Sequence, residues 1–147
     1  MTRGLSFILH VLTARLDRAA DRMLQAEHGV SYNRFLALTM VGELDVSTQR
    51  ALADALGVTE PSVSRMVGVL AADGLLDVQR SAAGERGRRL SLTEAGSTLV
   101  ASVQSRLEER FAELVKASGV GLDEYAEQTA RLLGTLEQVQ AREESTT

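Results

Sequence analysis

Cysteine and tryptophan are absent from this 147-residue chain, and proline occurs once. The lack of cysteine excludes disulfide bonds, thiolate-bound zinc and a thiol redox switch. It also fits the reducing cytosol, so we expect a cytoplasmic protein. Lysine is nearly absent too, since Lys116 is the only one among 16 basic residues. Arginine is therefore the general basic residue of the chain, which limits what its use at any one site can mean.

Signatures of catalysis and metal binding are missing as well. The sequence has no G-x-S-x-G, no H-E-x-x-H, no phosphate-binding glycine loop and no Cys–His pair. A carboxylate-only active site would leave no such motif, but nothing points to one, so we expect no enzyme and no cofactor. His10 and His28 are expected on one helix about 27 Å apart, too far to share a metal ion within a subunit. A site combining histidine and carboxylates across a dimer stays open as an alternative to no metal.

No apolar run is long enough to span a membrane. The first residues, MTRGLSFILHVLTA, do have the early arginine and short apolar run of a signal peptide. Their apolar positions, however, recur every three or four residues and continue to Leu24, with charged residues between them. This spacing favours one amphipathic helix over about residues 4–28 rather than an export signal, and we expect no membrane partner.

The composition predicts a helix-rich protein. Hydrophobic residues make up 44% of the chain and aromatic residues 3%, and 147 residues suffice to bury one core. We therefore expect a single domain over residues 1–147. Capping residues and apolar periodicity predict further helices at about 31–42, 48–56, 60–73, 94–118 and 123–141, followed by a frayed polar tail.

A helix-turn-helix followed by a hairpin is predicted within residues 45–93. Thr48 (or Ser47) and Thr59 suit the caps of two short helices that Gly57 separates. The sequences LLDVQR and RRLSLT then alternate with a period of two, and SAAGERG between them suits a turn. A hairpin directly after a helix-turn-helix is a wing. The predicted fold is mainly α with a small β-hairpin wing, flanked by long helices at residues 1–30 and 94–142.

Positive charge is concentrated in the predicted wing. Residues 78–90 hold four arginines and one acid, a local charge of +3, whereas the whole chain carries −4, so the remainder is −7. Such a concentration of positive charge is expected of a protein that binds a polyanion through one localised surface. The alternative is a solvated hairpin with no partner, but the position directly after a helix-turn-helix favours nucleic-acid binding.

These residues resemble the MarR family of bacterial winged-helix transcriptional regulators. The resemblance runs through TQRALADALGVTEPSVSRMVGVLAADGLL and ERGRRLSLTEAG, and the long helices on either side fit as well. One departure concerns the wing, which in the family often carries Asp-x-Arg. That register falls on Gly84-Glu85-Arg86, so the aspartate thought to hold the arginine is missing unless Glu85 replaces it.

The resemblance implies that the helix at about residues 60–72 enters the major groove of double-stranded DNA with its N-terminal half. Val63, Val67 and Leu70 must face inward, which leaves the base contacts to Pro61, Ser62, Ser64 and Arg65. We expect Arg65 to contact a guanine. Backbone or minor-groove contacts are expected from these residues: Thr48, Gln49, Thr59, Arg80, Ser81, Arg86 and Arg88.

Each of these assignments has a purely structural alternative. Ser62 and Ser64 would then only solvate the first helical turn, and Thr48 would be only a cap. Arg65 would pair with Glu60 or Asp73 instead of a base.

The terminal helices carry apolar stripes that a lone wing domain cannot cover, so we expect a two-fold homodimer. A monomer that folds its last two helices onto its own core is the alternative. The family resemblance also implies a small aromatic or lipophilic effector that releases DNA. His10, Tyr32, Phe35 and Met40 suit such a pocket, but ordinary core or surface roles are equally open, and no effector is identified.

The function predicted from these features is a transcriptional repressor that binds a pseudo-palindromic operator as a homodimer. The main alternative is a helical protein-interaction module that keeps the winged fold without specific DNA binding. Retention of Arg65 and of the wing arginines favours the regulator.

Overall fold

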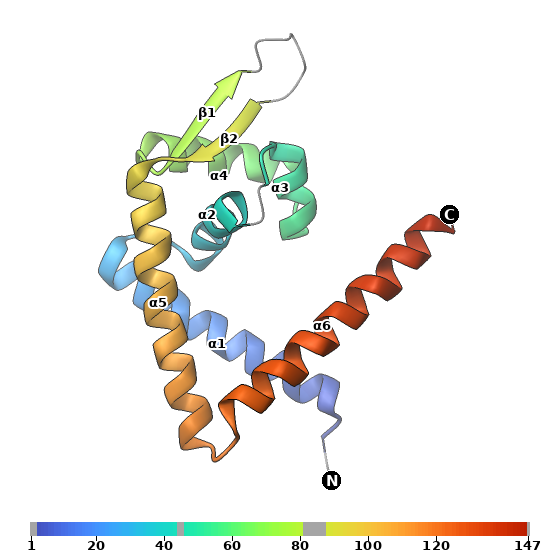
Figure 1. Ribbon diagram of the computed structural model, residues 1–147. Coiled ribbons are helices and arrows are strands. Elements are labelled where there is room, and N and C mark those ends of the chain that lie inside the picture. The colour runs from blue at the N-terminus through green and yellow to red at the C-terminus, as the bar shows by residue number, and fades with distance from the viewer. Residues whose placement is uncertain (1–2, 44–45, 81–87, 147) are drawn as a thin grey trace. The chain divides into compact units, whose positions relative to one another are not determined.

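The computed structural model describes residues 3–43, 46–80 and 88–146 of the chain. Two compact units are present, Met1–Gln104 and Ser105–Thr147, and their boundary falls within one helix. The elements in chain order are α1 (Leu5–His28), α2 (Tyr32–Glu43), α3 (Gln49–Leu56), α4 (Glu60–Ala72), β1 (Leu76–Arg80), β2 (Arg88–Leu92), α5 (Glu94–Ala117) and α6 (Leu122–Ser145) (Figure 1). The prediction of a mainly helical chain with one hairpin is confirmed.

Helix boundaries follow local chemistry. The Thr48 hydroxyl accepts a hydrogen bond from the backbone N–H of Ala51 at 3.1 Å, and that of Thr59 accepts one from Ser62 at 3.3 Å. These side chains replace the partners that the first N–H groups of a helix lack. Gly57 ends α3 in the left-handed conformation, with φ of 67°, where glycine is favoured over other residues. The caps predicted for both helices are confirmed.

The core of the first unit draws on all its helices. Leu24 of α1, Leu38 of α2, Leu52 of α3 and Leu70 of α4 are almost completely buried, as is Val103 of α5. Burying a side chain of this size contributes roughly 1.5–3 kcal/mol to folding. Around this core, α2, α3 and α4 lie beside the β1–β2 hairpin (Figure 1). The helix-turn-helix therefore packs directly against the hairpin.

The hairpin is antiparallel and in a single register. Leu76 pairs with Leu92 and Val78 with Leu90, while Leu76 and Leu90 are buried against the core. Ser47, just before α3, extends this sheet, because its carbonyl accepts a hydrogen bond from the Leu90 N–H at 2.7 Å. The sequence did not lead us to predict this third pairing.

The start of α5 is locked to the end of the helix-turn-helix. The Thr93 hydroxyl donates to the Gly74 carbonyl at 2.6 Å and accepts from the Gly96 N–H at 3.0 Å, while the Thr93 N–H donates to the Leu75 carbonyl at 3.2 Å. Gly96 is buried, and a Cβ at this position would overlap the Leu75 carbonyl oxygen. The sequence LTEAG thus combines a cap with a close approach that only glycine permits.

We expect Gly96→Ala to destabilise the first unit by about 1–3 kcal/mol, the usual cost of forcing extra volume into a packed site. The clash is with backbone, which cannot move aside as a flexible side chain can. Urea denaturation measures the change, and Ser97→Ala at the exposed neighbouring position is the control, with little expected effect. An unchanged midpoint for Gly96→Ala would mean that α5 can shift away from Leu75.

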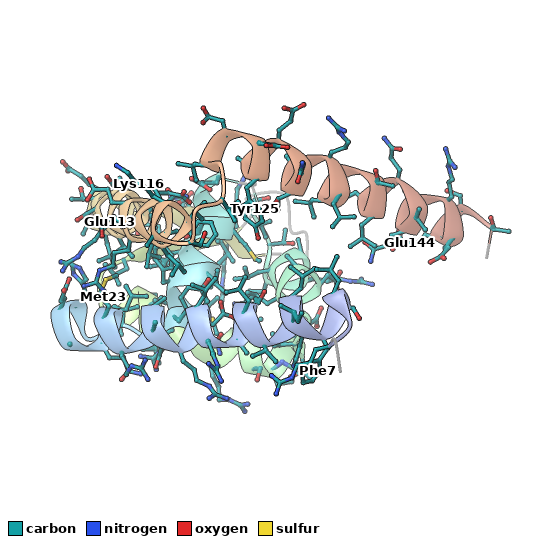
Figure 2. The ribbon with its side chains drawn as sticks, turned by 90° about the horizontal axis from the view of Figure 1, so that it is seen from below. Phe7, Met23, Glu113, Lys116, Tyr125 and Glu144 are labelled. Atoms are coloured by element: carbon teal, nitrogen blue, oxygen red, sulfur yellow. The ribbon has the colours of Figure 1, made fainter. Side chains whose placement is uncertain are left out.

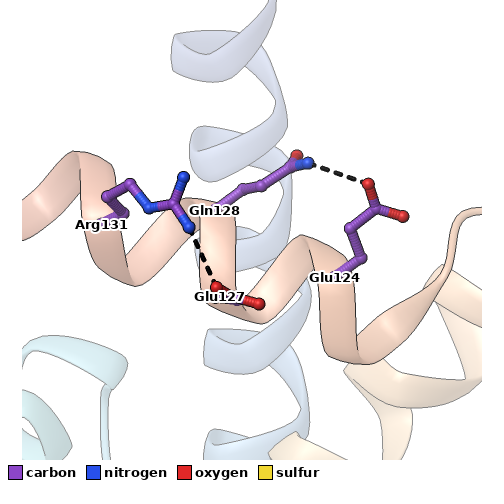
Figure 3. Close-up of polar contacts among 4 residues, drawn as sticks. All are labelled: Glu124, Glu127, Gln128 and Arg131. Carbon is purple, nitrogen blue, oxygen red and sulfur yellow. Dashed lines mark hydrogen bonds and ion pairs between the residues drawn. The ribbon is translucent and has the colours of Figure 1, made fainter.

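The second unit contains the end of α5 and all of α6, on which Figure 2 labels Tyr125 and Glu144. Gly119, with φ of 81°, turns the chain between the two helices. On α6, Gln128 donates to Glu124 at 3.1 Å and Arg131 to Glu127 at 2.9 Å (Figure 3). Such exposed pairs one turn apart each add only about 0.2–0.5 kcal/mol to a helix.

The frayed tail predicted after Ala141 is wrong, because α6 continues to Ser145. The Ser145 hydroxyl donates to the Ala141 carbonyl at 2.8 Å, and that of Thr146 to the Arg142 carbonyl at 2.9 Å. Polarity misled the prediction, because glutamate and arginine are good helix formers.

Candidate nucleic-acid interface

The outer face of α4 is the surface that the sequence assigns to base contacts. Val63, Val67 and Leu70 are buried, as predicted. The opposite side exposes Pro61, Ser64 and Arg65, and Ser62 is half-buried. Pro61 stands in the first turn, where its missing N–H costs no helical hydrogen bond. The four predicted base-contact residues thus lie together in the first half of α4, and their contact with DNA stays a prediction.

Arg65 is free of the ion pairs that would give it a purely structural role. Within residues 46–80, neither Glu60 nor Asp73 forms a salt bridge with Arg65. An exposed guanidinium without a protein partner keeps its whole planar set of donors for a ligand. This geometry favours an external acceptor for Arg65.

The N-terminus of α3 lies against strand β2. Thr48 is exposed, caps α3, and forms an isolated antiparallel bridge with Arg89. Arg89 is itself exposed, on the side of β2 opposite buried Leu90. An α-helix N-terminus and a guanidinium brought together in this way both favour an anion. Arg89 was missing from the predicted contacts, although the alternation in RRL placed it outward.

Gln49 differs from the other predicted backbone contacts. Its residue is half-buried, and its side-chain Nε2 is buried with no hydrogen-bond partner in the described part of the chain. A buried amide donor without a partner is costly. The contact of Gln49 with a phosphate remains a prediction.

The hairpin brings arginine positions together at its outer end. Arg80 and Arg88 are cross-strand partners, and Arg89 pairs with Gln79. Arg80 is exposed. The register of the hairpin thus places two arginine positions opposite each other. Ser81 and Arg86, like Gly84 and Glu85, lie outside the described residues.

The residues suggested for an effector pocket are only partly brought together. Tyr32 and Phe35 stand with ring centroids 6.2 Å apart, but Phe35 is buried in the core. Met40 is half-buried, and His10 is exposed on α1. Tyr32 borders a shallow groove of about 400 Å³ between α1 and the start of α2, lined also by Asp17, Arg18, Asp21, Arg22, Ser31 and Asn33.

Tyr32 ties α2 to α1 in this groove. Its backbone N–H donates to Asp21 Oδ1 at 2.9 Å. Burial, followed by the negative charge of Asp17 and the hydrogen bond that the Tyr32 hydroxyl donates to it, raises the pKa of Tyr32. The folded protein therefore holds the phenolic proton more tightly than the unfolded chain does.

We expect this difference to make stability fall as the pH rises through about 10, the pH at which tyrosine in the unfolded chain is half ionised. Well below that pH the proton is bound in both states and the contribution of Tyr32 is complete. Urea denaturation at pH 8 and at pH 10.5 measures the loss. Tyr32→Phe should lessen it, whereas Tyr125→Phe on α6 should not; equal losses in both variants would contradict the assignment to Tyr32.

Residues 3–43, 46–80 and 88–146 hold no group of three histidine, aspartate or glutamate side chains that would suit a metal ion. Within the same ranges, every helix is too short or too polar to cross a membrane.

Comparisons with known proteins bear on the fold that carries this surface. A model of the MarR family matches residues 28–87. Wild-type apo MarR from E. coli is 20% identical, with a TM-score of 0.76 over 92% of this chain and 98% of that chain. MepR, a transcription regulator of the Staphylococcus aureus multidrug efflux pump MepA, is 24% identical, with a TM-score of 0.67 over 93% and 99%. The structure of an S. aureus MepR–DNA complex is 24% identical, with a TM-score of 0.71 over 94% of this chain and 99% of that chain. The predicted winged helix-turn-helix fold is confirmed.

Proposed function

We propose that this chain, which belongs to the MarR family, is a sequence-specific double-stranded DNA-binding repressor of transcription. The observation that carries the proposal is the exposed Arg65 on the outer face of α4, which forms no ion pair within the described residues. Thr59 caps the N-terminus of the same helix, and the hairpin that packs against α4 exposes Arg80 and Arg89. α4 enters the major groove, and the hairpin contacts the backbone or the adjacent minor groove. The MepR–DNA complex supports this arrangement by its likeness of fold. No catalytic role is proposed, and a DNA target implies a cytoplasmic location.

The proposed assembly is a homodimer. α1 leaves Leu5 70% exposed and Phe7 52% exposed, and Figure 2 shows Phe7 near the N-terminal end of α1, far along the helix from the buried Met23. α6 leaves Leu132, Leu133, Leu136 and Val139 exposed. Apolar surface of this extent is typical of an interface. Two-fold symmetry would set two copies of α4 roughly 34 Å apart, so the operator is a pseudo-palindrome.

The proposed regulator responds to a small aromatic or lipophilic effector. An effector changes DNA affinity only if it binds differently to the DNA-bound and free arrangements of the dimer. Its binding residues are not assigned, and the groove beside Tyr32 is one region to test by substitution.

Fluorescence anisotropy tests the proposal. The protein is titrated onto duplex DNA from upstream of its own gene and onto a scrambled duplex, over a range of salt concentrations. We expect selective binding that weakens steeply with salt, because each phosphate contact releases condensed counterions.

We expect Arg80→Ala and Arg89→Ala each to weaken binding to both duplexes to a similar extent. Each should reduce the slope of log K against log salt concentration by about 2, because a homodimer loses one phosphate contact in each half-site. An unchanged slope would remove these arginines from the interface. The protein-interaction module would be favoured instead if the wild type bound both duplexes weakly and equally and showed no preference within a pool of random sequences.

A further inference from the structure

The second half of α4 carries a feature that neither the core nor a cap explains. Val58 and Val69 are the exposed large hydrophobic residues of the described winged-helix part, residues 46–80 and 88–93. Val69 is 37% exposed and lies one turn beyond Arg65, on the same side of α4. A stiff β-branched side chain is not a favourable choice for an exposed helical position.

Gly68, beside Val69, is equally unexplained by the protein itself. It lies inside α4, its φ is not positive, and a Cβ at this position would meet nothing within 4 Å. Glycine inside a helix destabilises it relative to alanine. A helical wheel of α4 at 100° per residue places Pro61, Arg65, Gly68 and Ala72 at the centre of the outer face. Arg65 is thus the one long side chain there, and the next two residues on this face, Gly68 and Ala72, are small and apolar.

We propose that Val69 and Gly68 determine part of the operator: Val69 contacts the 5-methyl group of a thymine next to the guanine bound by Arg65, and Gly68 lets the α4 backbone approach the bases closely. This inference rests on the proposed DNA-binding function. The thymine methyl is the one apolar group that base pairs present in the major groove, and a small aliphatic side chain suits it. The neighbouring guanidinium of Arg65 makes DNA, rather than an apolar protein surface, the fitting occupant.

The first test uses DNA selected from a randomised duplex library by the wild-type protein. In the enriched duplex, the thymines are replaced by uracil one at a time, and each replacement removes only the 5-methyl group. We expect one position per half-site at which uracil weakens wild-type binding about fourfold, the change in affinity that corresponds to the burial of one methyl group. Val69→Ala should bind the thymine duplex more weakly and should lose its response to uracil there, while Val58→Ala keeps it. Val69→Thr, of the same shape, serves if Val69→Ala folds poorly.

Two results would overturn the inference while leaving the function intact: an enriched duplex that tolerates uracil at every position, or Val69→Ala responding to uracil as the wild type does. A selection that enriches no sequence would instead overturn the DNA-binding function, and this inference with it.

The second test separates stability from binding at Gly68. We expect Gly68→Ala to raise Tm by about 2–4 °C, through the better helix propensity of alanine, and to weaken operator binding about tenfold or more. Gly134→Ala on α6 is the matched control, because its Cβ would also meet nothing within 4 Å and a helical wheel places it opposite Leu132 and Leu136. It should raise Tm similarly without changing DNA affinity. Full operator affinity in Gly68→Ala would contradict the close approach.

Discussion

Arg65→Ala is expected to remove most of the sequence selectivity while leaving non-specific DNA binding in place. A bidentate contact with guanine contributes about 1–3 kcal/mol of discrimination, and a dimer makes it in two half-sites. The expected loss of operator affinity is therefore roughly 30-fold to 20,000-fold. Because Arg65 is exposed and forms no ion pair in the described part of α4, its removal leaves no buried partner unpaired. The variant should fold like the wild type.

Two substitutions make this measurement specific. Arg65→Lys keeps the charge but loses the planar fork, so its affinity should fall between those of the wild type and Arg65→Ala. Arg110→Ala removes an exposed arginine of α5 and should leave operator affinity unchanged. Anisotropy on operator and scrambled duplexes gives the ratio of the two affinities. Selectivity that survives Arg65→Ala would keep the regulator but assign the base contact to another residue of α4.

Features set by neighbouring residues could be predicted from the sequence. Thr59 caps α4 because its hydroxyl reaches an N–H three residues on, and Gly57 ends α3 because glycine tolerates a positive φ. The inward side of α4 followed from its apolar spacing alone. These are interactions within one or two helical turns, where sequence separation and spatial separation coincide.

Contacts between distant segments could not be predicted in the same way. The pairing of Ser47 with Leu90 joins residues far apart in the chain, and a two-residue stretch has no alternation to reveal it. The orientation of Gln49 depends on what packs over the start of α3, so the sequence placed it among the phosphate contacts while its amide nitrogen is buried. The same dependence on packing separates Phe35, which is in the core, from the half-buried Tyr32. A candidate site therefore emerges from sequence where a single helix or hairpin carries it.

The apolar side of α6 leads to the second prediction, that Leu132→Asp combined with Leu136→Asp converts the proposed dimer to a monomer. Both leucines are exposed by more than half in the single chain, and they lie one turn apart on one side of α6. Burying two carboxylates in an apolar interface costs several kcal/mol each unless they find partners. α6 should remain helical, because these positions are exposed and its polar pairs are untouched.

Sedimentation equilibrium measures the change in mass, and operator binding should fall with it. A monomer keeps one α4 and so contacts one half-site, which removes about half of the phosphate and base contacts. Gln138→Asp introduces a single carboxylate on the other side of α6 and should leave both the proposed dimer and operator affinity intact. A monomeric wild type would contradict the homodimer outright. A double variant that stays dimeric would exclude Leu132 and Leu136 from the interface and assign it to the exposed apolar residues of α1, Leu5 and Phe7.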